Sequence, residues 1–209
     1  MTATVFSRRL AMLALAITTV ALGACAPRVT RISPDQAIDL SGRWNDVDSR
    51  MVAEALIQQS FAASGGQSWA NRFAQTNGGE RPTVIVGTIR NRSMEHVPVG
   101  TFVRDLERAY INSGSVQVVS SKGERDEIRG EREDQQEYAA ADTRARLRME
   151  TGADYMLQGE IQSIEDREGG RSVVFYQVDL TLTDLENNGK VWVGQHKIKK
   201  FIDRPRFGL

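Results

Sequence analysis

The stretch RSVVFYQVDLTLTDL (residues 171–185) alternates apolar and polar side chains with a period of two. Successive side chains of a β-strand point to opposite faces, so this pattern predicts a strand with one face buried and one face in water. The buried face would carry the apolar set: Val174, Tyr176, Val178, Leu180 and Leu182. The glutamine, aspartate and threonines between them would face solvent.

Two further strands flank this one in the sequence, over residues 155–164 and 191–202. Gly169-Gly170 joins the first pair, and Asn188-Gly189 joins the second with the dipeptide that best tolerates the positive backbone angles of a tight hairpin. Three consecutive strands linked by hairpins predict an antiparallel meander at the C-terminal end of the domain.

Upstream, helical and strand patterns alternate. Residues 83–89 (TVIVGTI) are apolar on both faces, which is typical of a central strand, and a short strand follows at 116–119. Between them we expect a helix that Thr101 caps and Gly114 stops. The order of elements predicts an α/β (α+β) fold: a mixed sheet of four or five strands flanked by helices, with the C-terminal antiparallel meander.

Two further segments are expected to be helical. One is capped by Asp46 or Asp48 and runs to about residue 62, with an apolar stripe at Met51, Val52, Ala55, Leu56 and Gln59. The other is residues 122–150, which hold nine acidic and seven basic residues. We expect two helices there, broken near residues 139–142 and stopped by Gly152.

The first 24 residues have the organisation of an export signal. Arg8 and Arg9 precede an apolar stretch of 13 residues, 10–22, which is too short to span a membrane. The stretch ends in Leu22-Gly23-Ala24-Cys25, which resembles the bacterial lipobox and implies lipidation of Cys25. Acyl chains would hold the mature protein at a membrane without spanning it. The alternatives are an ordinary secretory signal cut after Ala24 and a short membrane anchor.

The chain is accordingly divided into a lipoprotein signal peptide (1–24), a lipidated cysteine with its tether (25–40), one globular domain (41–203) and a tail (204–209). Lipoproteins of this kind resemble outer-membrane ones when the residue after the cysteine is not aspartate, and here it is Ala26. We therefore expect a protein that is lipid-anchored in the outer membrane and faces the periplasm.

Charge and composition exclude several functions. The 209 residues hold 27 basic and 27 acidic side chains, so there is no electrostatic reason to expect nucleic acid as a partner. One cysteine and two histidines leave little for metal binding, and we expect no metal and no cofactor. Catalytic motifs such as a nucleophile elbow, a phosphate loop or a paired zinc-ligand helix are absent from the sequence. We expect no enzyme and no catalytic residue.

Some residues still invite a functional interpretation. His96 and His196, or carboxylates paired across strands among Glu160, Asp166 and Asp179, would be the groups for catalysis, although a solvated role is ordinary for each. The basic residues of the last strand and tail form either a binding surface or an edge that discourages pairing with other chains: Lys197, Lys199, Lys200, Arg204 and Arg206. Residues 122–150 are either solvated helices or a docking surface.

Several segments in a fixed order resemble the LpoB-type activators of penicillin-binding proteins, over roughly residues 39–202. They are TVIVGTIRNRS (83–93), INSG (111–114), VVS (118–120), GADYML (152–157), KVWVG (190–194) and DLSGRWND (39–46). The resemblance implies an outer-membrane lipoprotein that is not an enzyme. Its globular domain would bind a class A penicillin-binding protein and stimulate peptidoglycan synthesis.

One departure from that family concerns reach. Well-known members carry a long proline-rich tether, whereas residues 26–40 span at most about 50 Å when extended. For the partner-binding surface, our hypothesis is the loop after the first strand with the polar face of the next helix, because a charged face beside an open loop can pair with a partner without disturbing the core. Its residues are Asn91, Arg92, Arg104, Glu107 and Arg108.

Two other functions stay open. One is a structural, secretion or assembly lipoprotein of the envelope that resembles curli-secretion components, although such a protein needs two further long hairpins. The other is a periplasmic hydrolase of wall material that would use His96 or Glu160.

Overall fold

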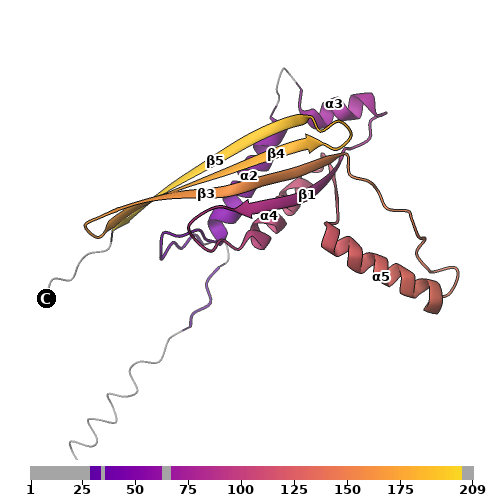
Figure 1. The fold of residues 1–209 in the computed structure, drawn as a ribbon, viewed down its shortest axis with the longest axis horizontal. Coiled ribbons are helices and arrows are strands. Elements are labelled where there is room, and N and C mark those ends of the chain that lie inside the picture. Colours follow the sequence, from indigo (N-terminus) through magenta and orange to yellow (C-terminus); the bar gives the residue numbers. More distant parts are fainter. Residues whose placement is uncertain (1–28, 34–35, 63–66, 204–209) are drawn as a thin grey trace, which may run out of the picture. The chain divides into compact units, whose positions relative to one another are not determined.

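Five strands form one mixed sheet in the computed structural model, which describes residues 29–33, 36–62 and 67–203 (Figure 1). The strands are β1 (Thr83–Asn91), β2 (Gln117–Val119), β3 (Tyr155–Glu168), β4 (Arg171–Asp184) and β5 (Lys190–Asp203). The helices are α2 (Asp46–Phe61), α3 (Trp69–Thr76), α4 (Val99–Ser113) and α5 (Lys122–Tyr138).

The strand order is β2-β1-β3-β4-β5. β1 pairs in parallel with β2 and β3, while β3, β4 and β5 pair antiparallel. The mixed sheet with a C-terminal meander, predicted from the sequence, is therefore confirmed. β1 lies between its two parallel neighbours, β2 and β3. This position agrees with the apolar pattern on both of its faces.

β3, β4 and β5 extend beyond β1. β1 pairs with β3 only as far as Ile161, whereas β3 and β4 pair along their full length to Glu168 and Arg171. The last seven residues of β3, Gln162–Glu168, therefore have a strand on one side only. We call this end of the three strands the distal end.

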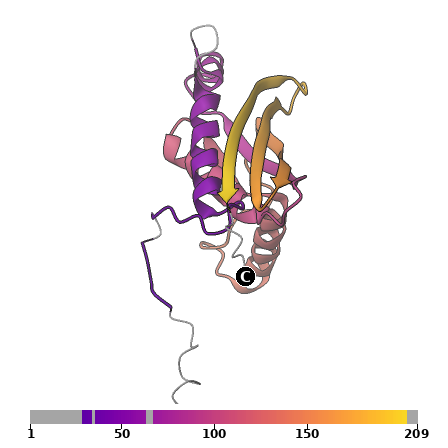
Figure 2. The ribbon, with the colours of Figure 1, turned by 90° about the vertical axis from the view of Figure 1, so that its left-hand side faces the viewer.

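Helices α2 and α4 cover one face of the sheet, and α2 lies along it in Figure 2. The apolar set of β4 points to this side and is buried with Phe102, Leu106 and Tyr110 of α4. The alternate residues of β4 are only partly buried. We call the helix-covered side the inner face and the other side the outer face.

Helix α2 begins one residue earlier than a cap at Asp46 predicts, and three residues earlier than a cap at Asp48 predicts. Asn45, rather than Asp46 or Asp48, is the N-cap: its side chain accepts from the Asp48 backbone N–H, and the Asp48 carboxylate accepts from the Asn45 N–H. This reciprocal pair is a capping box, which the spacing of Asn45 and Asp48 could have indicated. Val52 and Leu56 are buried as predicted, but Met51 is 44 % exposed. Ala53 and Ile57 are buried instead, because α2 packs against both α4 and β5.

Helix α4 also begins before its predicted cap. Its N-cap is Pro98, and Thr101 already lies inside the first turn. The ring of Pro98 holds φ at −73°, so the chain enters the helix there without a side-chain cap. Gly114 ends the helix in the left-handed conformation, with φ at 65°, as predicted.

The segment 122–150 contains one helix rather than two. α5 carries a capping box between Ser121 and Glu124 and buries none of its residues. The expected second helix is replaced by turns, and Arg148 has a φ of 57°, which a right-handed helix does not allow. The expected second helix would be short, and a short helix is stable only when it buries an apolar face. Leu147 and Met149 are exposed, so this segment has no such face.

The two hairpins of the meander differ. Gly169 and Gly170 both have positive φ and form the two-residue turn that the sequence predicts. The β4–β5 connection instead spans residues 185–189, and Asn188 has positive φ there. Asp184 accepts from two backbone N–H groups of this connection and lengthens the turn.

The predicted signal peptide, Cys25 and the tail 204–209 lie outside the described residues. In the part of the chain that the structure describes, no helix has the length and apolar character needed to cross a membrane.

We expect Gly159→Ala to lower the free energy of unfolding by about 2–3 kcal/mol, because a Cβ at this position on β3 would lie 2.2 Å from the Asp179 carbonyl oxygen. The matched control is Gly130→Ala in α5, where a Cβ would meet nothing within 4 Å. The control should leave the fold intact and raise stability by up to about 1 kcal/mol, because alanine is the better helix former. Urea unfolding at neutral pH measures both, and equal effects would contradict the close approach at Gly159.

Candidate interaction surfaces

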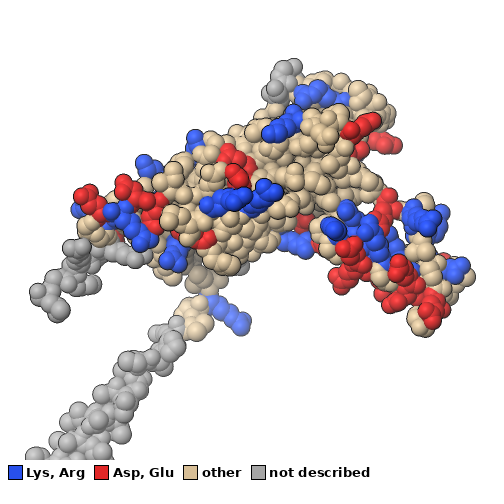
Figure 3. All heavy atoms as spheres, viewed as in Figure 1, with Lys and Arg blue, Asp and Glu red and all other residues tan. Residues whose placement is uncertain are grey.

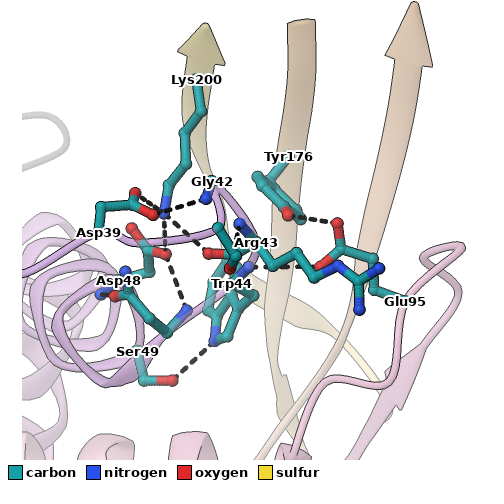
Figure 4. A network of polar contacts seen from close by, with 11 residues as sticks. Asp39, Gly42, Arg43, Trp44, Asp48, Ser49, Glu95, Tyr176 and Lys200 are labelled. Atoms are coloured by element: carbon teal, nitrogen blue, oxygen red, sulfur yellow. Dashed lines mark hydrogen bonds and ion pairs between the residues drawn. The ribbon is translucent and has the colours of Figure 1, made fainter. Parts of the chain in front are cut away.

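Lys200 of β5 fastens the N-terminal edge of the domain to the sheet (Figure 4). Its Nζ lies 2.7 Å from the Asp39 carboxylate, forms a second ion pair with Asp48 and donates to the Arg43 carbonyl oxygen at 3.0 Å. The side chains of Lys200 and Asp48 are only 11 % and 7 % exposed. This ammonium thus connects residues 39–43, helix α2 and strand β5, and we call the arrangement the N-terminal clip.

Gly42 and Trp44 complete the clip. Gly42 has a φ of 71°, donates its N–H to Asp39 and approaches Ile202 so closely that a Cβ would clash. The Trp44 indole N–H donates to the Ser49 hydroxyl at 2.7 Å, and its ring meets Phe102 and Tyr176 edge to face.

Glu95 extends this network into the loop after β1. Its carboxylate accepts a hydrogen bond from the Tyr176 hydroxyl at 2.7 Å and another from the Trp44 backbone N–H at 3.3 Å. Burial, and then the hydrogen bond to Glu95, raise the pKa of Tyr176 far above its usual range, so the phenol stays a neutral donor. The loop is thereby fixed between the clip and β4.

The clip also sets two pKa values. Burial alone would raise the pKa of Asp39, but the hydrogen bond from Lys200 and that from Gly42 outweigh it and lower the pKa. Burial alone would lower the pKa of Lys200, but its bonds to Asp39 and Asp48 raise it. Both groups are therefore charged at neutral pH, and their attraction holds the segment in place.

The five residues predicted to bind a partner have different surroundings. Asn91 shapes its own loop, because its side chain donates to the Glu95 carbonyl and accepts from Ser93. The Arg92 side chain is exposed and has no charged partner among the described residues.

The helix members of that set are already paired. Arg104 bridges Glu107 at 2.9 Å and Glu124 of α5 at 2.6 Å, while Arg108 pairs with Asp105. The structure thus joins Arg104 with Glu107, and within the described residues no hydrogen bond or ion pair connects the α4 members to Asn91 or Arg92. Their role in binding stays a prediction.

Helix α5 carries mixed charges (Figure 3). Arg129 pairs with Asp126 and with Glu150, and Arg132 also pairs with Glu150. These exposed pairs tie the end of the following loop to the helix, and each contributes little to stability.

The carboxylates considered for catalysis lie on the outer face. Glu160 and Asp179 are cross-strand neighbours, but Glu160 accepts from Gln162, and Asp179 accepts from Gln177 and Gln195. They line a polar hollow of about 430 Å³ with Arg90, Lys190 and several threonines. Across residues 29–33, 36–62 and 67–203, no group of three or more His, Cys, Asp or Glu is placed to hold a metal ion.

Sequence reasoning missed the clip because it placed Lys200 in a single basic cluster with Lys197 and Lys199. The period-two alternation of β5 separates them: Lys197 and Lys199 point to the outer face, whereas Lys200, opposite Val174, points to the inner face. That alternation was the available signal. Arg204 and Arg206 lie outside the described residues.

Replacing Lys200 by methionine should lower the free energy of unfolding by about 2–3 kcal/mol, because Asp48 would keep a buried carboxylate without its cation. Lys197→Met, which removes an exposed lysine of the same strand, is the matched control and should be neutral within about 0.5 kcal/mol. Urea unfolding at pH 7 compares the two. A neutral K200M would show that the clip adds no stability.

The contribution of the clip should also depend on pH. The pKa of Asp39 is lowered from 3.8, so its contribution is present above that value and is lost as the pH falls through the lowered pKa. The pKa of Lys200 is raised from 10.5, so its contribution is present below that value and is lost as the pH rises through the raised pKa. Unfolding of wild type and K200M across the pH range should therefore differ most between about pH 5 and 9. A difference that does not shrink outside this range would contradict an ionic clip.

Comparison with solved structures finds matches at low identity, with TM-scores below 0.5. The C-terminal domain of LpoB from Escherichia coli is 13 % identical, with 73 % of this chain and 99 % of that chain covered and a TM-score of 0.44. The equivalent domain from Salmonella enterica is 14 % identical, with 75 % and 99 % covered and a TM-score of 0.37. A lipoprotein from Neisseria meningitidis is 17 % identical, with 60 % and 88 % covered and a TM-score of 0.37. No curated protein sequence matches the chain.

The assignment depends on the family model instead. The model of the peptidoglycan-synthase activator LpoB matches residues 48–198, which is more than half of the chain. That range includes all five strands up to Ile198, together with helices α3, α4 and α5 and most of α2. The resemblance noted in the sequence is therefore confirmed, and the chain belongs to the LpoB family of peptidoglycan-synthase activators.

Proposed function

We propose that this protein is an outer-membrane lipoprotein that binds a class A penicillin-binding protein and activates peptidoglycan synthesis. The observation that carries the proposal is the match to the activator family over residues 48–198. The family's members act on a synthase rather than on a substrate, so a partner-binding surface and not a catalytic centre is the site to look for.

The geometry is compatible with an adaptor. On the outer face, Glu160 and Asp179 are engaged by glutamine side chains. The clip, in turn, fixes the start of the folded domain against β5, so a pull on the tether acts on the whole sheet.

The anchor is the second part of the proposal. Acylation of Cys25 would hold the protein in the outer membrane with the domain in the periplasm, because each buried methylene contributes about 0.8 kcal/mol. The lipobox-like Leu22-Gly23-Ala24-Cys25 and the Ala26 that follows it support this placement.

The activity test uses the full lipoprotein, purified in detergent from membranes, with each purified class A penicillin-binding protein of the source bacterium. We expect the rate of glycan polymerisation from a lipid-linked disaccharide precursor to rise several-fold with one of these synthases. An unrelated lipoprotein purified in the same detergent is the control. Absence of both binding and stimulation with every class A synthase would refute the activator function.

The anchor test compares wild type with Cys25→Ser. Intact mass should show acyl chains on the native N-terminal cysteine, and C25S should move from the outer-membrane fraction to a soluble or uncleaved form. A native protein without acyl mass, or one found in the cytosol, would exclude the lipid anchor while leaving the synthase test unaffected.

A further inference from the structure

Helix α5 and the loop that follows it, residues 122–150, lie outside the buried core, and we call them the arm. α5 buries none of its residues and makes no extensive contact with another helix or strand that the structure describes. A helix in a protein draws most of its stability from packing rather than from propensity, so a helix this exposed is unusual. The apolar side chains of the arm are exposed as well: Ile128, Tyr138, Leu147 and Met149.

The loop of the arm is fixed to one side of α5. The side chain of Gln136 donates to the Ala145 carbonyl oxygen at 2.8 Å. Glu150 forms ion pairs with Arg129 at 2.9 Å and with Arg132 at 3.1 Å. Positions 129, 132 and 136 are spaced by three and four residues and therefore share one side of the helix. The loop covers this side and leaves the opposite side of α5 free.

The free side of α5 carries carboxylates. Glu127, Asp134 and Glu137 are spaced by seven and three residues, so they share one face of the helix. All three are exposed, and none of them forms an ion pair with another described residue. Acidic side chains gather along the lower border of α5 in Figure 3. We call these three residues the acidic face.

The loop carries the opposite charge. Arg144, Arg146 and Arg148 are exposed and alternate with Ala145, Leu147 and Met149. None of the three arginines forms an ion pair within the described part of the chain. Because the loop is held on the far side of α5, these arginines do not pair with the acidic face of their own arm. We call them the arginine loop.

The charges of the arm nearly balance. Of its nine acidic and seven basic residues, three and two form ion pairs, which leaves six carboxylates and five cations unpaired. A partner surface of a single sign would be attracted by one part of the arm and repelled by another. The surface that fits must carry both signs, and a second copy of the arm carries both in the matching numbers.

We propose that the arm is a self-association surface through which two copies of this chain form a dimer. The acidic face of one copy contacts the arginine loop of the other, and a two-fold axis repeats the contact with the roles exchanged. The exposed apolar side chains of the loop would lie between the two arms. Exposed ion pairs are individually weak and are screened by salt, so the dimer is reversible and weakens at high ionic strength. This inference does not depend on the synthase.

The experiment measures the mass of the full lipoprotein by sedimentation in a detergent whose density matches that of the buffer. Two variants each reverse one half of the surface. The first makes the acidic face basic, with Glu127→Lys, Asp134→Lys and Glu137→Lys. The second makes the arginine loop acidic, with Arg144→Glu, Arg146→Glu and Arg148→Glu.

The matched control reverses the same number of charges outside the arm. Lys190, Lys197 and Lys199 are exposed on β5 and form no ion pair among the described residues, so their triple replacement by glutamate changes the net charge as much as the arginine-loop variant does. It leaves the acidic face and the arginine loop intact. Far-ultraviolet circular dichroism compares the helix content of all variants.

Wild type should pass from monomer to dimer as its concentration rises. Each arm variant alone should raise the dimer dissociation constant by about tenfold or more, because it brings like charges together. An equimolar mixture of the two arm variants should recover the dimer, since each reversed surface then meets the opposite sign. This recovery separates a lost contact from a lost fold. The β5 control should dimerise like wild type.

Three results would overturn the proposal. The first is a wild type that stays monomeric at its highest soluble concentration, and the second is a dimer that the arm variants leave unchanged. The third is a mixture of the two arm variants that stays monomeric. A photo-crosslinking residue at position 134 should yield a covalent homodimer in membranes, and capture of a synthase in its place would identify another occupant. Stimulation of a synthase is measured separately, so the activator function stands or fails independently of the dimer.

Discussion

Covering only one face of the sheet with helices is the constraint on which the rest of the structure depends. From Tyr176 to Thr183 the apolar side chains of β4 alternate with polar ones, so packing α2 and α4 on one side buries the first set and leaves the second partly in water. The strand β1, apolar on both faces, escapes the same rule because it is central and its Gly87 is overlaid by the side chains of Met156 and Gln158. Once this asymmetry is set, the inner face supplies the buried core, and the side chains of the outer face stay partly in water.

The N-terminal clip shows how a short sequence can serve the fold rather than a ligand. The residues DLSGRWND (39–46) resemble members of the activator family, and four of them have a structural task. Asp39 holds Lys200, Gly42 permits the close approach to Ile202, Trp44 fills the space between α4 and β4, and Asn45 caps α2. A segment with these tasks fixes the start of the folded domain to β5, the strand at the far edge of the sheet.

The sequence predicted the elements that obey a simple period and missed those that depend on tertiary partners. The three meander strands, the central strand β1 and the left-handed Gly114 followed from alternation and glycine placement. The start of α4 was misplaced because the backbone restraint of Pro98 acts before Thr101, and the second helix after residue 139 failed for lack of a surface on which to pack. The candidate surface was harder to predict than the fold. The sequence does not show which acidic residues pair with Arg104 and Arg108, and only the structure places Glu124 and Asp105 against them.

The clip also limits where a partner can be. It fixes the start of the folded domain, at Asp39, to strand β5 through Lys200. Under the proposed acylation of Cys25, the distance from the anchor to this point is bounded by residues 26–40, at about 50 Å when fully extended. A long tether would let an activator cross to its synthase, whereas a tether of this length would require the synthase to present its docking surface closer to the outer membrane. The two halves of the proposed function are thus coupled: the shorter the tether, the further the synthase itself must project.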